Sequence, residues 1–209
     1  MSVGTREFDE VFQEAEPGRK GQILECAMDV FDEKGYDGGS MREIASRVGV
    51  RESALYRHFP GKEAILKALI RVVGTRARDE ALALIGSLQG DDIHAEVLSV
   101  IKNRRQAIKL YGPLLRLFLP VAARSPELLV EFRRDVFDPA SGRIVAKIAQ
   151  LDGVLGVPDA DDTRAVRIRG LVSFIVGYLA SSVFLGDEQD EPMADIAIRI
   201  MRWDTDAAV

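Results

Sequence analysis

The chain has 209 residues, of which 47% are hydrophobic and 29% charged, a balance typical of a globular protein with one or two domains. Its single cysteine excludes an internal disulfide, and its first residues lack the basic and apolar regions of a secretory signal, so we expect a cytoplasmic protein. The net charge of −5 argues against a nucleic-acid-binding protein unless basic residues are concentrated locally.

Charge is distributed unevenly along the chain. Residues 1–18 contain one basic and five acidic residues, whereas residues 19–62 contain eight basic and seven acidic residues. The second segment has the only positive balance, and only by one charge, so DNA binding has to be argued from local pattern. Apolar residues recur at helical spacing and no alternating strand pattern is present, which predicts an all-α protein.

The N-terminal part begins with an acidic arm that Pro17-Gly18 separates from the first helical pattern. Phe8, Val11, Phe12 and Ala15 follow one helix face, so the arm is either a short docked helix or a frayed tail. The next helix is predicted over residues 19–34, with Gly35 ending it in a left-handed conformation. Its stripe of apolar residues comprises Ile23, Ala27, Val30 and Phe31.

A helix-turn-helix pattern follows. Ser40 and Glu43 form a capping box, in which each side chain reaches the other residue's amide, at the start of a helix over residues 41–48. Gly49 permits the sharp turn, and a second helix is predicted near residues 52–58. In this layout the second helix is free to enter a major groove.

Residues 19–66 resemble the N-terminal DNA-binding domain of the TetR family. The resemblance is carried by Ile44-Ala45, by Val48-Gly49-Val50 and by the run from Ala54 to Glu63, ALYRHFPGKE. It implies a three-helix DNA-binding head over residues 19–66 and a larger helical body, over residues 67–209, for ligand binding and dimerisation. The expected partners are double-stranded operator DNA, a second copy of the chain and an unidentified small-molecule effector.

The resemblance also implies roles for individual residues of the head. Ser40 matches the residue that caps the first helix of the motif and often touches phosphate, and Tyr56 and Lys62 match residues that meet the DNA backbone. The groove-facing positions are occupied by Arg51, Glu52, Ser53, Arg57 and His58. Arg51 stands where a capping Ser or Thr is common, and Ala54 where a hydroxyl is frequent. Each residue has a plainer interpretation: a packing aromatic for Tyr56, a cover for the helix end for His58, and solvated charges for Arg51, Arg57 and Glu52.

Beyond Lys62 the apolar spacing predicts a series of long helices. These are residues 62–88, with a break allowed near Gly74-Thr75, then 92–110, 113–123, 126–137, 139–151, 158–185 and 193–203. The stretch Leu171–Leu185 contains no charged residue, but it is shorter than the about 20 residues that span a bilayer. We therefore interpret it as a buried helix and expect no membrane association.

Two functions are expected of the body. The helices over residues 160–185 and 193–203 would pair with those of a second copy, with Gly170 and Gly177 on one side, although burial within one subunit is the alternative. A ligand cavity would be lined by mostly uncharged residues, which favours a lipophilic effector, although each of them could equally be an ordinary core residue. The candidates are Tyr111, Leu114, Leu117, Phe118, Phe132, Phe137, Phe174 and Tyr178, with Arg104 and Arg116 as polar anchors.

Other chemistries find little support in the sequence. The two histidines, His58 and His94, are far apart and no Cys/His spacing suggests a metal site, and no phosphate loop or nucleophile motif is present. Cys26 lies among apolar residues and is interpreted as a small core residue rather than a redox sensor. We therefore expect no enzyme, cofactor or metal, and a repressor released by its ligand. The alternative is a helical carrier or enzyme that binds a small molecule without DNA.

Overall fold

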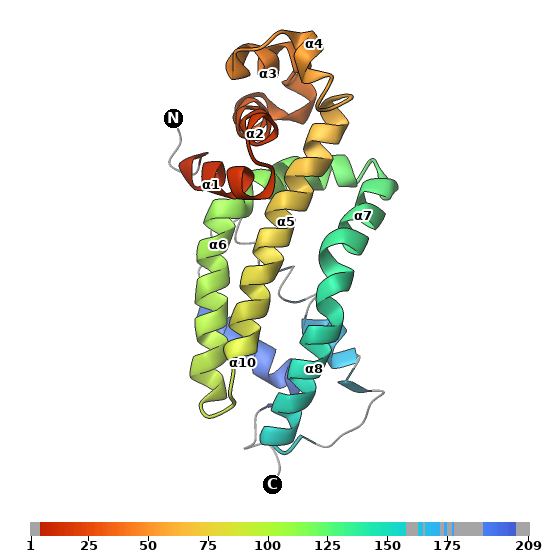
Figure 1. The fold of residues 1–209 in the computed structure, drawn as a ribbon. Helices are drawn as coiled ribbons and strands as arrows, with labels where there is room; N and C mark the ends of the chain where they lie inside the picture. The colour runs from red at the N-terminus through yellow and green to blue at the C-terminus, as the bar shows by residue number, and fades with distance from the viewer. Residues whose placement is uncertain are drawn as a thin grey trace. The chain divides into compact units, whose positions relative to one another are not determined.

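The computed structural model describes residues 5–157, 163–164, 166–171, 174, 177 and 190–203. Every regular element within this part of the chain is helical, which confirms the predicted all-α class (Figure 1). In chain order the elements are α1 (Thr5–Ala15), α2 (Arg19–Gly38), α3 (Met41–Val48), α4 (Glu52–Leu55), α5 (Lys62–Ser87), α6 (Ile93–Ala122), α7 (Pro126–Phe132), the π-helix η1 (Arg133–Phe137), α8 (Asp138–Val154) and α10 (Asp190–Met201).

The chain divides into two compact units. Unit 1 contains residues 1–78 and 110–139, and unit 2 contains residues 79–109 and 140–209. The division expected from the sequence, into an arm, a DNA-binding head and a body, concerns function and stays a prediction. Within the described residues, no helix has both the length and the apolarity needed to cross a membrane.

In unit 1 the acidic arm is the docked helix α1 rather than a frayed tail. Phe12 is completely buried, and α1 packs against α2. The approach is close, because a Cβ at Gly21 would lie 2.6 Å from the carbonyl oxygen of Glu16. Glu16 also pairs with Arg71 of α5 at 2.8 Å, so one residue of the arm contacts two helices of unit 1.

Gly74 of α5 marks a close contact and not the break that the sequence allowed. The helix runs without interruption from Lys62 to Ser87. A Cβ at Gly74 would lie 3.0 Å from a methyl group of Val136 and 3.2 Å from the ring of Phe132. The missing side chain therefore lets α5 approach the segment formed by α7 and η1.

Two of the predicted helix boundaries are wrong. The sequence predicts separate helices on either side of Pro113, whereas α6 continues through both Pro113 and Pro120. It also predicts a break before Pro139, whereas α7, η1 and α8 follow one another directly. The reason at Pro113 is packing: Tyr111, Leu114 and Leu117 are buried on both sides of it. That continuous apolar face outweighs the about 3 kcal/mol that a proline costs inside a helix.

Unit 2 is held together by an apolar core and one buried polar network. The core joins α6, α8 and α10, and includes Val97, Ile101, Leu151, Met201 and Trp203. α10 ends at Met201 and is followed by Arg202, a non-glycine residue in the left-handed region with φ 58°. The turn brings Trp203 back to the carbonyl of Ile198, with an N–O distance of 3.0 Å.

The polar network centres on Asp152, whose exposed fraction is 1%. Its carboxylate accepts hydrogen bonds from Arg167 at 2.7 and 3.1 Å, from Arg164 at 3.0 Å and from the indole of Trp203 at 3.1 Å. Arg167 also donates to the carbonyl of Met201 at 2.6 Å. Burial alone would raise the pKa of Asp152, but these hydrogen bonds outweigh it and hold that pKa below its ordinary value. The network thus ties α8 to the segment around residue 167 and to the end of α10.

Candidate DNA-binding surface

The local sequence positions α3 as predicted. The hydroxyl of Ser40 accepts a hydrogen bond from the amide of Glu43 at 3.3 Å, and Gly49 ends the helix with φ 75°, which confirms the cap and the turn. The second half of the expected capping box is wrong, because the carboxylate of Glu43 pairs with Lys34 at 2.6 Å. That ion pair joins α3 to α2 and fixes the first helix of the motif.

The second helix of the motif is shorter than predicted. α4 spans Glu52–Leu55, and the turn that follows keeps the hydrogen bond from the amide of Phe59 to the carbonyl of Leu55 at 3.0 Å. Leu55 and Phe59 are buried, so this short segment is anchored by its apolar side. Arg51 occupies the N-cap without a side-chain hydrogen bond, since a guanidinium group has no acceptor atom.

The candidate residues around the motif share one property, exposure to solvent. Tyr56 has an exposed fraction of 47%, so almost half of its side chain is open to solvent. The other exposed candidates are Ser40, Arg51, Glu52, Ser53, Arg57 and His58. Seven of the eight candidates are thus exposed to solvent, six of them within residues 51–58, and their contact with DNA stays a prediction.

Among the described residues of the head, two basic side chains near this surface form ion pairs and three exposed arginines do not. The pairs of Lys34 with Glu43 and of Arg47 with Glu33 neutralise two basic residues of the head. The hydrogen bond from Arg47 lowers the pKa of Glu33, so that carboxylate stays charged. The exposed residues Arg42, Arg51 and Arg57 make no ion pair with any described residue. Positive charge therefore concentrates at the start of α3 and along the turn and α4.

Arg42 is a candidate that the sequence analysis missed. It lies in the first turn of α3, two residues after Ser40, and its side chain is exposed. A free guanidinium beside the amides of a helix start suits a phosphate group. The signal was present in the sequence, because the second residue after an N-cap lies on the capped end of the helix, but its lack of a carboxylate partner becomes visible only in the structure.

Lys62 is arranged differently from the other candidates. Its ammonium group donates to the carbonyl oxygens of Tyr36 at 2.6 Å, Gly39 at 3.0 Å and Asp37 at 3.3 Å. It also lies 4.5 Å from the centre of the Tyr36 ring. An ammonium has three protons, so all of them are used here. Lys62 therefore holds the start of α5 against the negative end of α2 and the link to α3, and a phosphate contact of this group stays a prediction.

The candidate ligand-binding residues do not gather into one described cavity. In unit 1, Tyr111, Leu114, Leu117 and Phe118 of α6 are buried, and Phe118 lies 5.0 Å from the half-buried ring of Phe132. Arg116 is exposed. In unit 2, Phe174 packs against the apolar core. The side chains of Arg104, Phe137 and Tyr178 lie outside the described residues, as does most of Leu171–Leu185. The ligand cavity of the body thus stays a prediction.

Comparisons with known proteins relate the segment that carries this surface to one protein family. Residues 23–69 match the family described as "Bacterial regulatory proteins, tetR family". The transcriptional regulator BetI 2 of Chromohalobacter salexigens is 28% identical over 163 residues, which is 78% of this chain and 76% of that protein. The class A tetracycline repressor from transposon 1721 of Escherichia coli is 27% identical over 106 residues, 51% of this chain and 47% of the repressor, so that alignment spans about half of either protein.

The fold extends the likeness to almost the whole chain. The TetR-family transcriptional regulator PfmR of Thermus thermophilus superposes with a TM-score of 0.60, covering 86% of this chain and 97% of that one. At 23% sequence identity this similarity shows a shared fold. The matched relatives are regulators of transcription and not enzymes.

Proposed function

Because the chain belongs to the TetR family of bacterial regulatory proteins, we propose that it is a dimeric repressor whose hold on operator DNA is relaxed by a small molecule. The observation that carries the proposal is the exposed surface of α3, the turn and α4, where Arg42, Arg51 and Arg57 have no carboxylate partner among the described residues. The DNA-binding head comprises residues 19–66, behind the arm of residues 1–18, and residues 67–209 serve ligand binding and dimerisation.

In this proposal α4 enters a major groove. Arg51 and Arg57 contact base edges, where a guanine offers two acceptors to one guanidinium. The hydroxyl of Tyr56 and the capping residue Ser40 meet phosphates, and phosphate contacts set the position of the protein without reading sequence. Glu52, Ser53 and His58 are also at groove-facing positions, and a carboxylate such as that of Glu52 can accept from a cytosine amino group.

The second copy of the chain is proposed to pack against the helical segment around residue 170. Val166 is 63% exposed, and Gly170 and Gly177 lie four and eleven residues further on, which places all three on one helix face. Ile196 of α10 is 39% exposed as well, and a Cβ at Gly170 would lie 3.5 Å from Ile200 of the same helix. An exposed apolar face on two neighbouring helices suits a twofold interface, which would set two recognition helices about 34 Å apart.

The switch is proposed to act through α5. This helix starts at Lys62, which holds the end of α2, and continues without a break to Ser87. A ligand that favours another position of α5 would alter the setting of the motif. Coupling of this kind is worth about 1–3 kcal/mol and acts in both directions, so operator DNA must weaken ligand binding by the factor by which ligand weakens DNA binding.

A gel-shift experiment with the DNA upstream of the protein's own gene tests the proposal. The wild type should shift this DNA at concentrations that leave random DNA of equal length free, and Arg57→Ala should reduce that difference by the about 1–3 kcal/mol of one base contact. Arg19→Ala, which removes an exposed arginine at the start of α2, is the matched control. Equal binding to both DNAs by the wild type would contradict a sequence-specific regulator. An effector found by a thermal-shift screen would then be titrated by calorimetry with and without that DNA, and equal affinities would exclude the switch.

A further inference from the structure

The acidic arm is seated on α2 by a buried aromatic side chain and by a close approach of two backbones. Phe12 is completely buried, and the side-chain amide of Gln13 donates to the carboxylate of Glu25 on α2 at 2.6 Å. Gly21 of α2 is also buried, and a Cβ at this position would lie 2.6 Å from the carbonyl oxygen of Glu16. The arm can therefore lie this close to α2 because residue 21 has no side chain.

Two ion pairs connect the arm to α5. Glu16 lies 2.8 Å from Arg71, and Glu14 lies 3.5 Å from Arg76. Glu16 also pairs with Lys20 of α2 at 3.7 Å, so one carboxylate is shared between two helices. The side chains of both arginines are about half exposed, and ion pairs in such positions are weak and screened by salt. The connection to α5 is therefore easier to break than the seat on α2.

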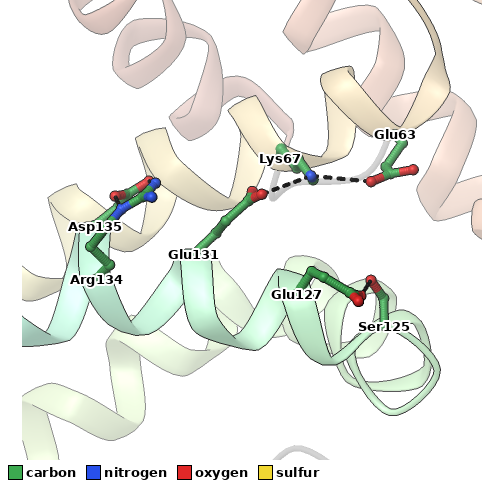
Figure 2. A network of polar contacts seen from close by, with 7 residues as sticks. All are labelled: Glu63, Lys67, Ser125, Glu127, Glu131, Arg134 and Asp135. Atoms are coloured by element: carbon green, nitrogen blue, oxygen red, sulfur yellow. Dashed lines mark hydrogen bonds and ion pairs between the residues drawn. The ribbon is translucent and has the colours of Figure 1, made fainter.

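The two arginines lie beyond the end of the expected head. Arg71 and Arg76 follow residue 66 by five and ten residues, or by about 8 and 15 Å along the helix. This stretch of α5 is also held by a helix outside the head, because the ammonium group of Lys67 lies 2.9 Å from the carboxylate of Glu131 on α7 (Figure 2). The arm thus extends from the head to a part of α5 that α7 holds as well.

The docked arm keeps its acidic residues away from the candidate DNA-binding surface. Residues 1–18 contain five acidic residues and one basic residue. Figure 1 shows α1 crossing α2 on the side away from α3 and α4, where the exposed residues Arg42, Arg51 and Arg57 lie. An arm released from this position would stay tethered to the start of α2. Its carboxylates would then compete with DNA phosphates for these arginines.

We propose that the arm is a releasable strap that holds the head in its DNA-binding setting. In the docked state it joins α2 to the stretch of α5 beyond residue 66, so a movement of the head relative to this stretch must break the ion pairs with Arg71 and Arg76. Release frees the head to take other settings and brings the negative charge of the arm towards the DNA-binding surface. The effect on DNA rests on the proposed function, whereas the docking of the arm is a property of the protein alone.

Hydrogen exchange of the α1 amides in the full-length protein measures the docking. A helix of 11 residues is barely stable in water by itself, so an undocked arm loses its protection. Gly21→Ala adds a Cβ that meets a backbone atom of the arm, and the α1 amides should exchange at least about tenfold faster. Gly86→Ala is the matched control, because a Cβ at this glycine of α5 has no such neighbour within 4 Å. Both changes favour the helix that carries them, so the seat of the arm is what separates the two variants.

A second pair of variants tests the connection to α5 without touching the seat. Glu16→Gln should speed the exchange of the α1 amides by about 1.5- to fivefold, the effect of losing one exposed ion pair. Glu10→Gln is its control, because Glu10 is exposed on the same helix and forms no ion pair with a described residue. Circular dichroism spectra of all four variants should retain the helical signal of the wild type. The strap is overturned if Gly21→Ala and Glu16→Gln exchange as their controls do.

Gel shifts with the DNA upstream of the protein's own gene measure the consequence for DNA binding. The apparent affinity falls with the fraction of heads in the binding setting, so a fall to about one half or one third in each subunit weakens a dimer about four- to tenfold. Gly21→Ala should show this loss, and Gly86→Ala should bind as the wild type does. Wild-type affinity in a Gly21→Ala protein whose arm is released would overturn the strap. A wild type that binds this DNA no better than random DNA would contradict the repressor proposal, and the exchange of the α1 amides would then decide on the strap.

Discussion

Replacing Asp152 by asparagine should be among the most damaging single changes to unit 2. The asparagine keeps the shape of the side chain but removes the charge that faces Arg167 and Arg164. The carboxylate receives four hydrogen bonds, three of them from guanidinium groups, and its exposed fraction is 1%. An asparagine oxygen still accepts from Trp203, but the buried Arg167 loses its counter-ion. We expect a loss of about 3–5 kcal/mol in the free energy of unfolding, as for other broken buried pairs.

Tryptophan fluorescence measures this loss of stability in unit 2. Trp203 is the only tryptophan of the chain, and it donates directly to Asp152, so its emission in a urea titration follows unit 2. The protein concentration is held constant because dimerisation would shift the midpoint. Asp195→Asn is the control: its exposed carboxylate pairs with His94, and its loss should change stability by less than about 1 kcal/mol. Equal midpoints for the two variants would refute the assigned role of the network.

The same network predicts a response to acid. Since the pKa of Asp152 is lowered by folding, its contribution is present above the ordinary pKa of 3.8 and is lost as pH falls through the lower folded value. The wild type should therefore lose stability below about pH 4 more steeply than Asp152→Asn does. Parallel stability curves for the two proteins over that range would show that the carboxylate is not preferentially ionised in the folded state.

Three further predictions concern the head. Lys62→Met should lower the free energy of unfolding by about 1–3 kcal/mol, because three carbonyl oxygens lose their hydrogen-bond donor. It should also weaken the binding of operator and random DNA alike. An unchanged melting temperature together with a lower salt dependence of DNA binding would instead place the ammonium group on a phosphate. Tyr56→Phe should also weaken both DNAs while leaving stability within about 0.5 kcal/mol, because this side chain is 47% exposed, and wild-type affinity would remove its hydroxyl from the interface. Arg51→Ala and Arg57→Ala should each cost about 1–3 kcal/mol of operator binding and relax the preference at one base pair, whereas a uniform loss across sequences would reduce that arginine to a phosphate contact.

The helix-turn-helix was predictable because its signals are local. Ser40 and Gly49 fix the two ends of α3 through hydrogen bonds and φ values that depend only on neighbouring residues. The exposure of the polar residues between 51 and 58 follows from the burial of Leu55 and Phe59, which the apolar spacing also predicts. The family resemblance added roles to this pattern, and those roles remain to be tested residue by residue.

Features that depend on contacts between distant segments were not predictable. Pro113 signals a helix end by itself, and only the burial of α6 on both sides of it shows why the helix continues. No spacing links Lys62 to the carbonyl of Tyr36, 26 residues earlier, or Asp152 to Trp203, 51 residues later. The π-helix η1 has no recognisable sequence signal, although its Val136 forms the close contact with Gly74 of α5.

Selection of binding sites from a pool of random DNA duplexes tests the regulator assignment most directly. The full-length protein is incubated with the pool, the bound duplexes are amplified, and the cycle is repeated at rising salt to suppress nonspecific binding. We predict enrichment of a palindromic site whose half-site centres are about one helical turn apart or a multiple of it, and no enrichment with the double variant Arg51→Ala, Arg57→Ala. A pool that stays random with the wild type, or the same enriched site with the double variant, would contradict sequence reading by the surface of α3 and α4.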